Sequence, residues 1–180
     1  MGVMEPLVVP YDGWTVDDLP DDDLFRHSEL VDGALLVNPP PSLRHQETAM
    51  AMARLILPRL PGEWRVVVEP GVHFDRRNYR QPDVVVYDAA ALARDRIEPP
   101  DVRLAVEIMS PGSVSTDRVA KPAQYAAAGI PHFWRLELDP LVLVVHVLVG
   151  DVYREVARFD DAVEVDEPVA VRFHLSSLLD

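Results

Sequence analysis

The 180-residue chain contains no cysteine at all. This absence excludes disulfide bonds, cysteine-ligated zinc and thiol catalysis together. No apolar run approaches the roughly 18 residues that a membrane-spanning helix needs, and the longest candidate, residues 141–149, is interrupted by His146. The N-terminal segment carries acids but no basic stretch, so we expect no secretory signal, no membrane partner and a cytoplasmic protein.

Lysine is almost as scarce as cysteine. Lys121 is the only lysine among 17 basic residues, and the other 16 are arginines. Arginine is planar and permanently charged, whereas lysine is a compact charge that can lose its proton. In a chain so biased towards arginine, this lysine either persisted by chance or does what arginine does badly. Composition alone leaves both explanations open.

Several common catalytic motifs are missing as well. The six histidines show no H-x-x-x-H spacing, which argues against a zinc site. The sequence has neither a glycine-rich phosphate loop nor the G-x-S-x-G motif of serine hydrolases.

The net charge of −13 disfavours a strong non-specific DNA binder, because phosphate contacts need basic residues. The acids lie mainly at the two ends of the chain. Residues 1–40 carry −8 and residues 136–180 carry −7, whereas residues 41–135 carry +2. In this middle part Arg76, Arg77 and Arg80 form a cluster that fits either a solvated loop or a phosphate contact.

The pattern of elements predicts an α/β fold with a mixed sheet. We find no linker or repeat, so we expect one domain over residues 1–180, with residues 1–13 as a candidate disordered tail. Asp32-Gly33 predicts a tight hairpin at residues 29–37. Apolar spacing predicts helices at residues 42–59 and 115–128. Apolar runs predict strands at residues 64–69, 83–87, 102–108, 133–138, 141–148 and 152–159.

Two acids occupy the ends of predicted central strands. Asp83 opens one valine-rich run, and Glu107 lies within another, with apolar residues on both sides. An acid with apolar residues on both sides, like Glu107, is usually paired or metal-bound. Two carboxylates that share one hard cation, together with Lys121, form the minimal set for a magnesium-dependent phosphodiesterase. In this hypothesis the lysine stabilises developing charge or orients the attacking water.

Three further residues are weaker candidates. Glu69 ends the strand before Pro70-Gly71 and is either a third acid facing the metal or an ordinary turn residue. Gln124 shares a helix face with Lys121 and is a candidate contact for a phosphate or the attacking water. His45 lies one helical turn before Ala49, and we favour a capping or buried hydrogen-bonded histidine over a site role.

The chain also resembles a known family. The residues that carry the resemblance are Pro82-Asp83, Val106-Glu107-Ile108-Met109-Ser110-Pro111, Asp117, Lys121, Tyr125 and Gly129-Ile130-Pro131-His132-Phe133-Trp134. Over roughly residues 14–160 they resemble the Uma-type restriction endonuclease family of the PD-(D/E)XK nuclease superfamily. The resemblance implies a restriction-endonuclease-like mixed sheet flanked by helices, with an N-terminal hairpin and additional C-terminal strands. It also implies Mg²⁺ or Mn²⁺ as cofactor and DNA as substrate.

The sequence departs from the superfamily pattern E-x-K, because Met109 stands where that lysine belongs. We expect the following helix to return Lys121 to the same place, with Asp83, Glu107 and the carbonyl of Ile108 holding the metal. By analogy with nucleases that cut both strands, we expect a homodimer. Two alternatives stay open: a nuclease-derived binding module that no longer cuts, and a phosphodiesterase acting on RNA or a small nucleotide.

Overall fold

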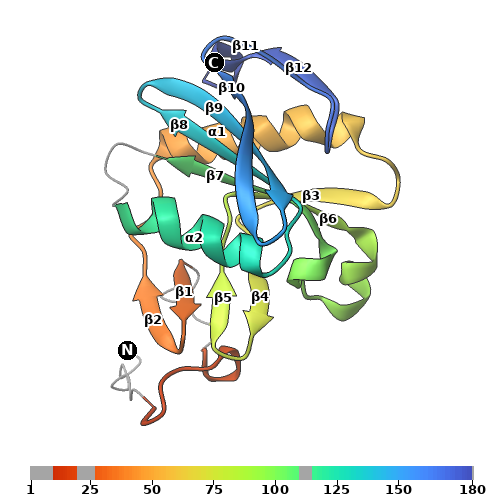
Figure 1. The fold of residues 1–180 in the computed structure, drawn as a ribbon. Coiled ribbons are helices and arrows are strands. Elements are labelled where there is room, and N and C mark those ends of the chain that lie inside the picture. Colours follow the sequence, from red (N-terminus) through yellow and green to blue (C-terminus); the bar gives the residue numbers. More distant parts are fainter. Residues whose placement is uncertain (1–9, 20–26, 110–114, 180) are drawn as a thin grey trace, which may run out of the picture.

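A six-stranded sheet forms the centre of the computed structural model. The model describes residues 10–19, 27–109 and 115–179, and for residues 115–119 it describes the backbone alone. The strand order of the sheet is β10-β9-β8-β7-β6-β3 (Figure 1). Within it β7 and β8 run parallel and the other neighbours run antiparallel. The mixed sheet predicted from the sequence is confirmed. The strands are β3 (Trp64–Val68), β6 (Val84–Asp88), β7 (Val102–Met109), β8 (His132–Leu138), β9 (Leu141–Val149) and β10 (Val152–Phe159).

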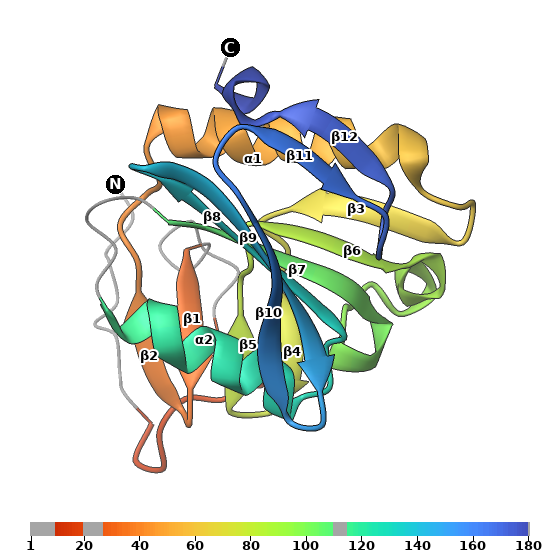
Figure 2. The ribbon, with the colours of Figure 1, turned by 45° about the horizontal axis from the view of Figure 1, so that its top comes forward.

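The central strands bury side chains on both faces of this sheet, which is why they read as continuous apolar runs. Val84 and Val106 belong to one apolar layer, together with helix α1 (Leu43–Ile56). Val85 and Ala105 belong to the other layer, together with Tyr125 of helix α2 (Ser115–Ala127). The two helices therefore cover opposite faces (Figure 2). Because successive side chains alternate, Glu107 points to the α2 face, like Ala105.

Helix α1 begins where the sequence predicts. Ser42 is the N-cap, and its hydroxyl accepts a hydrogen bond from the backbone N–H of His45 at 3.3 Å. A 3₁₀ turn, η3 (Leu57–Arg59), continues the helix to the predicted end. The buried residues recur at helical spacing and form the face that packs on the sheet: Thr48, Ala49, Met52, Ala53 and Ile56.

A second, four-stranded sheet has the order β2-β1-β5-β4 and is formed by β1 (Ser28–Val31), β2 (Ala34–Val37), β4 (Val72–Asp75) and β5 (Asn78–Arg80). The predicted hairpin is β1–β2, and Asp32 and Gly33 at its turn have φ of 51° and 81°, as a type I′ turn requires. For the arginines of residues 76–80 the sequence left a solvated loop and a phosphate contact open. Instead, residues 78–80 form β5, and Tyr79 pairs with Leu30 of β1.

The sequence analysis missed the last two strands, β11 (Ala162–Val165) and β12 (Val171–His174). Within the part of the chain that the structure describes, they pair only with each other, and Val163, Val165 and Val171 join the apolar layer of α1. The signal was the alternation of Val163 and Val165 with polar neighbours. The described chain ends with a 3₁₀ turn, η6 (Leu175–Leu178), and further 3₁₀ turns among the described residues are η1 (Val16–Asp18), η4 (Ala89–Arg94) and η5 (Pro99–Asp101).

The segment before β1 contacts the small sheet. Arg77 Nη1 donates to the carbonyl of Asp12, and the N–H of Trp14 donates to the carbonyl of Gly33. The expectation of a disordered tail falls largely on residues 1–9, outside the described part of the chain. Across the described ranges, no helix is long and apolar enough to cross a membrane.

The hairpin turn gives a test of the fold. Gly33→Ala should destabilise the protein by about 1–2 kcal/mol, because a Cβ in the left-handed region is strained, and it would lie 2.5 Å from Arg77 Nη2. Gly62→Ala is the matched control, because its φ is ordinary and nothing lies within 4 Å of the added Cβ. Urea denaturation measures both variants, and equal stability of the two would contradict the turn assignment.

Candidate active site

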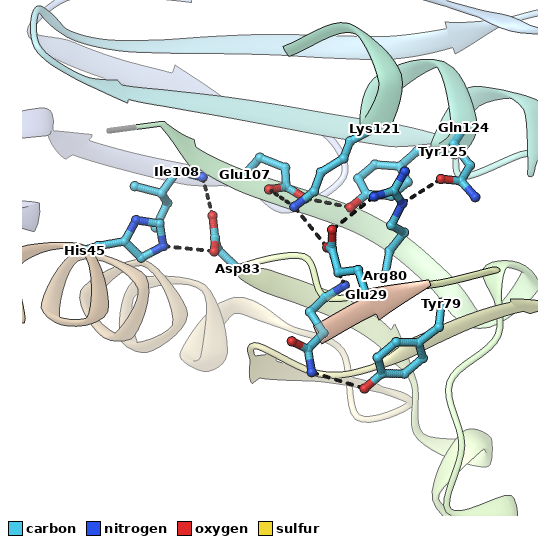
Figure 3. Close-up of polar contacts among 11 residues, drawn as sticks. Glu29, His45, Tyr79, Arg80, Asp83, Glu107, Ile108, Lys121, Gln124 and Tyr125 are labelled. Atoms are coloured by element: carbon cyan, nitrogen blue, oxygen red, sulfur yellow. Dashed lines mark hydrogen bonds and ion pairs between the residues drawn. The ribbon is translucent and has the colours of Figure 1, made fainter. Parts of the chain in front are cut away.

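The scarce lysine of the sequence is buried at the centre of an ionic cluster. Lys121 lies on α2 and is 8% exposed. Its Nζ lies 3.1 Å from Glu29 Oε1 of β1 and 3.2 Å from Glu107 Oε2 of β7 (Figure 3). A buried ammonium needs compensating charge, and two carboxylates from different sheets supply it.

Glu107 is enclosed on every side. It is 4% exposed, and its Oε1 accepts a hydrogen bond of 2.6 Å from the hydroxyl of Tyr125. Burial raises the pKa of Glu107 to about 7, although Lys121 and the Tyr125 hydroxyl favour the charged carboxylate. The nearby charge of Asp83 acts in the same direction as burial. Glu107 is therefore an acid whose protonation changes near neutral pH.

Glu29 joins the small sheet to this cluster. Its Oε2 accepts from Arg80 Nη1 at 3.0 Å, and its Oε1 accepts from the backbone N–H of Gln81 at 3.0 Å. Burial opposes ionisation, yet Lys121, the Gln81 amide and Arg80 together lower the pKa of Glu29. Two acids and two bases are thus buried in mutual contact.

Gln124 of α2 holds the arginine of this cluster. Its Oε1 accepts from Arg80 Nε at 2.7 Å, and its Nε2 donates to Asn78 Oδ1 at 3.3 Å. The sequence analysis offered a phosphate contact or a solvated loop for Arg80. Neither fits, because Arg80 is 3% exposed and pairs with Glu29.

Asp83 lies next to Glu107 for a reason of register. In the antiparallel pair β6–β7, Val84 is opposite Val106, and Asp83 directly precedes Val84, so its backbone lies beside the end of β7 at Glu107 and Ile108. Asp83 Oδ2 accepts from the backbone N–H of Ile108 at 2.5 Å. Asp83 is therefore held at the end of β7 beside the ionic cluster.

His45 and Glu69 complete a second group around Asp83. His45 Nε2 lies 2.9 Å from Asp83 Oδ1. One ligand atom each of His45, Glu69 and Asp83 lies within 4.8 Å of the others. Burial opposes protonation of His45, but the hydrogen bond to Asp83 and the charges of Asp83, Glu69 and Glu107 raise its pKa. These three side chains form a compact set of metal donors.

The backbone of Glu69 has a conformation that is unusual for glutamate. Its φ is 50°, in the left-handed region, which costs a non-glycine residue about 1 kcal/mol or more. Its N–H donates to the carbonyl of Asp83 at 2.9 Å. The turn after β3 therefore holds the Glu69 carboxylate beside Asp83.

The structure thus brings the six site residues predicted from the sequence into one region, but not as one ligand set. Glu107 contacts Lys121 and Tyr125 rather than joining the group of His45, Glu69 and Asp83. Ile108 contributes its N–H, and a metal contact through its carbonyl stays a prediction. Sequence reasoning missed Glu29 and Arg80, because both reach the site only through pairing of β1 with β5.

The arrangement combines three chemical functions in adjacent places. Carboxylates and an imidazole can hold a hard or borderline cation. A fixed ammonium can stabilise negative charge that develops on an oxygen. Glu107, between the two groups, can exchange a proton near pH 7. Together these functions are those that hydrolysis of a phosphate ester requires.

Comparison with known proteins agrees with the fold. A family model described as "Uma2: Putative restriction endonuclease" matches residues 16–177. A solved structure from Anabaena variabilis ATCC 29413, described as "a putative nuclease belonging to DUF820", matches with a TM-score of 0.70. It is 18% identical, and the match covers 92% of this chain and 97% of that one. At this identity the likeness shows the fold. No curated protein matches the chain.

The ionic cluster gives a stability prediction. Glu29→Ala should lower the free energy of unfolding by about 3–5 kcal/mol, because it leaves two buried cations facing one acid. Glu155→Ala is the control, because Glu155 pairs with Arg158 at the exposed surface, where ion pairs contribute little. Urea denaturation of both variants tests this. Equal, small losses would show that the cluster is not a buried network in solution.

Proposed function

The chain belongs to the Uma2 family, and we propose that it is a metal-dependent endonuclease that hydrolyses phosphodiester bonds in DNA. The observation that supports this best is the position of Lys121, between Glu29 and Glu107 and beside the donors around Asp83. Buried ion pairs add little net stability, so four buried charged groups in contact argue for a catalytic use.

The donor set fits a divalent cation. Asp83 and Glu69 offer carboxylate oxygens, Glu107 lies on the neighbouring strand β7, and His45 offers an imidazole nitrogen. Oxygen-rich sites suit Mg²⁺, and a histidine among the donors also suits Mn²⁺. When bound, such a cation polarises the phosphoryl group and lowers the pKa of its bound water. We therefore propose that Asp83, Glu69 and His45 hold Mg²⁺ or Mn²⁺, and that Glu107 joins them when the cation is bound.

The side chains around the metal donors have separate tasks in this proposal. Lys121 places a positive charge where negative charge develops in the transition state. Glu29 positions Lys121 through their ion pair, and Tyr125 positions Glu107 through a hydrogen bond from its hydroxyl. Gln124 acts at one remove, because it holds Arg80, which in turn holds Glu29. Cutting both strands of a duplex would use two such sites, and we propose a homodimer.

Conversion of supercoiled plasmid to nicked or linear DNA tests the proposed function. We expect Mg²⁺- or Mn²⁺-dependent conversion by the wild type, and a loss of at least about 100-fold in Asp83→Ala, since that variant removes the central metal donor. Asp151→Ala, at an exposed turn, should cut like the wild type. Equal cutting by all three proteins would contradict the assigned site. If the protein cut RNA or a small nucleotide but not DNA, the substrate in our proposal would be wrong.

Metal affinity should depend on pH through Glu107. Its carboxylate must be ionised to bind a cation, so affinity for Mn²⁺ should fall by up to about tenfold per pH unit as the pH drops below about 7. Tyr125→Phe removes a hydrogen bond that lowers the pKa of Glu107. In this variant the midpoint of the pH dependence of Mn²⁺ affinity should therefore move to higher pH. Calorimetric titration measures both curves, and an unchanged or lower midpoint in Tyr125→Phe would remove Glu107 from the metal site.

A further inference from the structure

A separate cavity of about 270 Å³ lies beside the active site, between the small sheet and the segment after β6. Its volume is just below the range of roughly 300–1,000 Å³ that is typical of sites for drug-sized ligands. It therefore suits a ligand no larger than a small ring system. The lining residues that matter for recognition are His73, Tyr79, Tyr87, Leu92, Asp95 and Arg96.

The cavity is connected to the ionic cluster through Tyr79. The hydroxyl of Tyr79 accepts a hydrogen bond from Gln81 Nε2 at 3.1 Å, and the backbone N–H of Gln81 donates to Glu29. On another side, Pro70 and Gly71 line the cavity and follow directly on Glu69. The cavity is therefore linked to the proposed site through Gln81 and through the chain that follows Glu69.

The ring of Tyr79 is fixed in place by its neighbours. Gly71 approaches it so closely that an added Cβ would lie 2.2 Å from the Tyr79 hydroxyl oxygen. The φ of Gly71 is ordinary, so this position needs glycine for the close approach alone. His73 packs edge-on against the ring, with centroids 4.9 Å apart. The part of the wall formed by His73 and Tyr79 is thus aromatic and closely packed.

Two polar atoms at the cavity have no hydrogen-bond partner. They are His73 Nδ1 and Arg96 Nε, both buried. Arg96 and Glu98 form an ion pair, with Arg96 Nε 3.4 Å from Glu98 Oε1, but the two atoms do not have the geometry of a hydrogen bond. Buried polar groups are nearly always hydrogen-bonded, and both of these exceptions belong to residues that line the cavity. Burial and the charge of Arg96 lower the pKa of His73, which favours its neutral imidazole.

We propose that this cavity binds a single nucleobase of the substrate strand, unstacked from its neighbours. The proposal rests on the proposed nuclease function. Tyr79, Tyr87 and His73 provide aromatic surface for a planar ring. Arg96 and Asp95 offer a donor and an acceptor, and neutral His73 offers either, as the mixed polar edge of a base requires. A phosphate fits less well, because Asp95 would repel it. The substrate would be single-stranded DNA or a duplex with an extruded base.

Binding of free nucleosides tests this proposal without any need for cleavage. In saturation-transfer NMR with EDTA present, the base protons of 2′-deoxyadenosine or thymidine should receive saturation from the protein. Leu92 lines the cavity and is 59% exposed, so Leu92→Trp should close its mouth and weaken binding at least tenfold. Arg96→Met should also weaken binding, without filling the cavity. Leu57→Trp is the matched control, because Leu57 is 56% exposed and does not line this cavity.

Three outcomes would overturn the proposal. They are no saturation of base protons in the wild type, equal binding by Leu92→Trp and Leu57→Trp, and full competition by 2-deoxyribose 5-phosphate or inorganic phosphate. Because these experiments contain no divalent metal, they are independent of the plasmid assay. A protein that cuts plasmid but binds no nucleoside keeps its nuclease function and loses the base pocket. The reverse result keeps the pocket and removes the nuclease.

Discussion

The burial of one ammonium between two carboxylates is the interaction on which the rest of the site depends. Lys121 stands on α2, Glu29 on β1 and Glu107 on β7, so three elements from distant parts of the chain must meet for its charge to be compensated. An unpaired charge in this place would be costly. The cluster therefore specifies how the small sheet, the large sheet and α2 are placed relative to one another.

The same cluster explains how the chain manages without a lysine on β7. Met109 occupies the position of the E-x-K lysine and is buried. Helix α2 lies in the connection between the parallel strands β7 and β8. From this helix the ammonium of Lys121 reaches Glu107 of β7. Lysine suits this position because its charge is compact. A planar guanidinium between Glu29 and Glu107 would engage both carboxylates and lie wider than the space that Lys121 fills.

Local signals made much of the fold predictable. Asp32-Gly33 defined the hairpin, Ser42 defined the start of α1, and valine-rich runs defined the central strands. Asp83, Glu107 and Lys121 were identifiable because each is unusual in its local context. Glu29 was not, because an acid in a short strand is ordinary until its strand is buried on both faces. Arg80 belongs to a three-residue strand, which is too short for a periodic pattern, so its partner across 51 residues could not be inferred.

The central claim is that Lys121 acts as a compact charge beside the scissile phosphate. Its most direct test is the single-turnover cleavage rate of Lys121→Arg, measured at saturating Mn²⁺ beside the wild type, with thermal melting to confirm folding. We predict a loss of about 100- to 1,000-fold, the size typical of removing one group that stabilises transition-state charge, with Mn²⁺ binding retained. A folded Lys121→Arg protein that cuts at the wild-type rate would contradict the account.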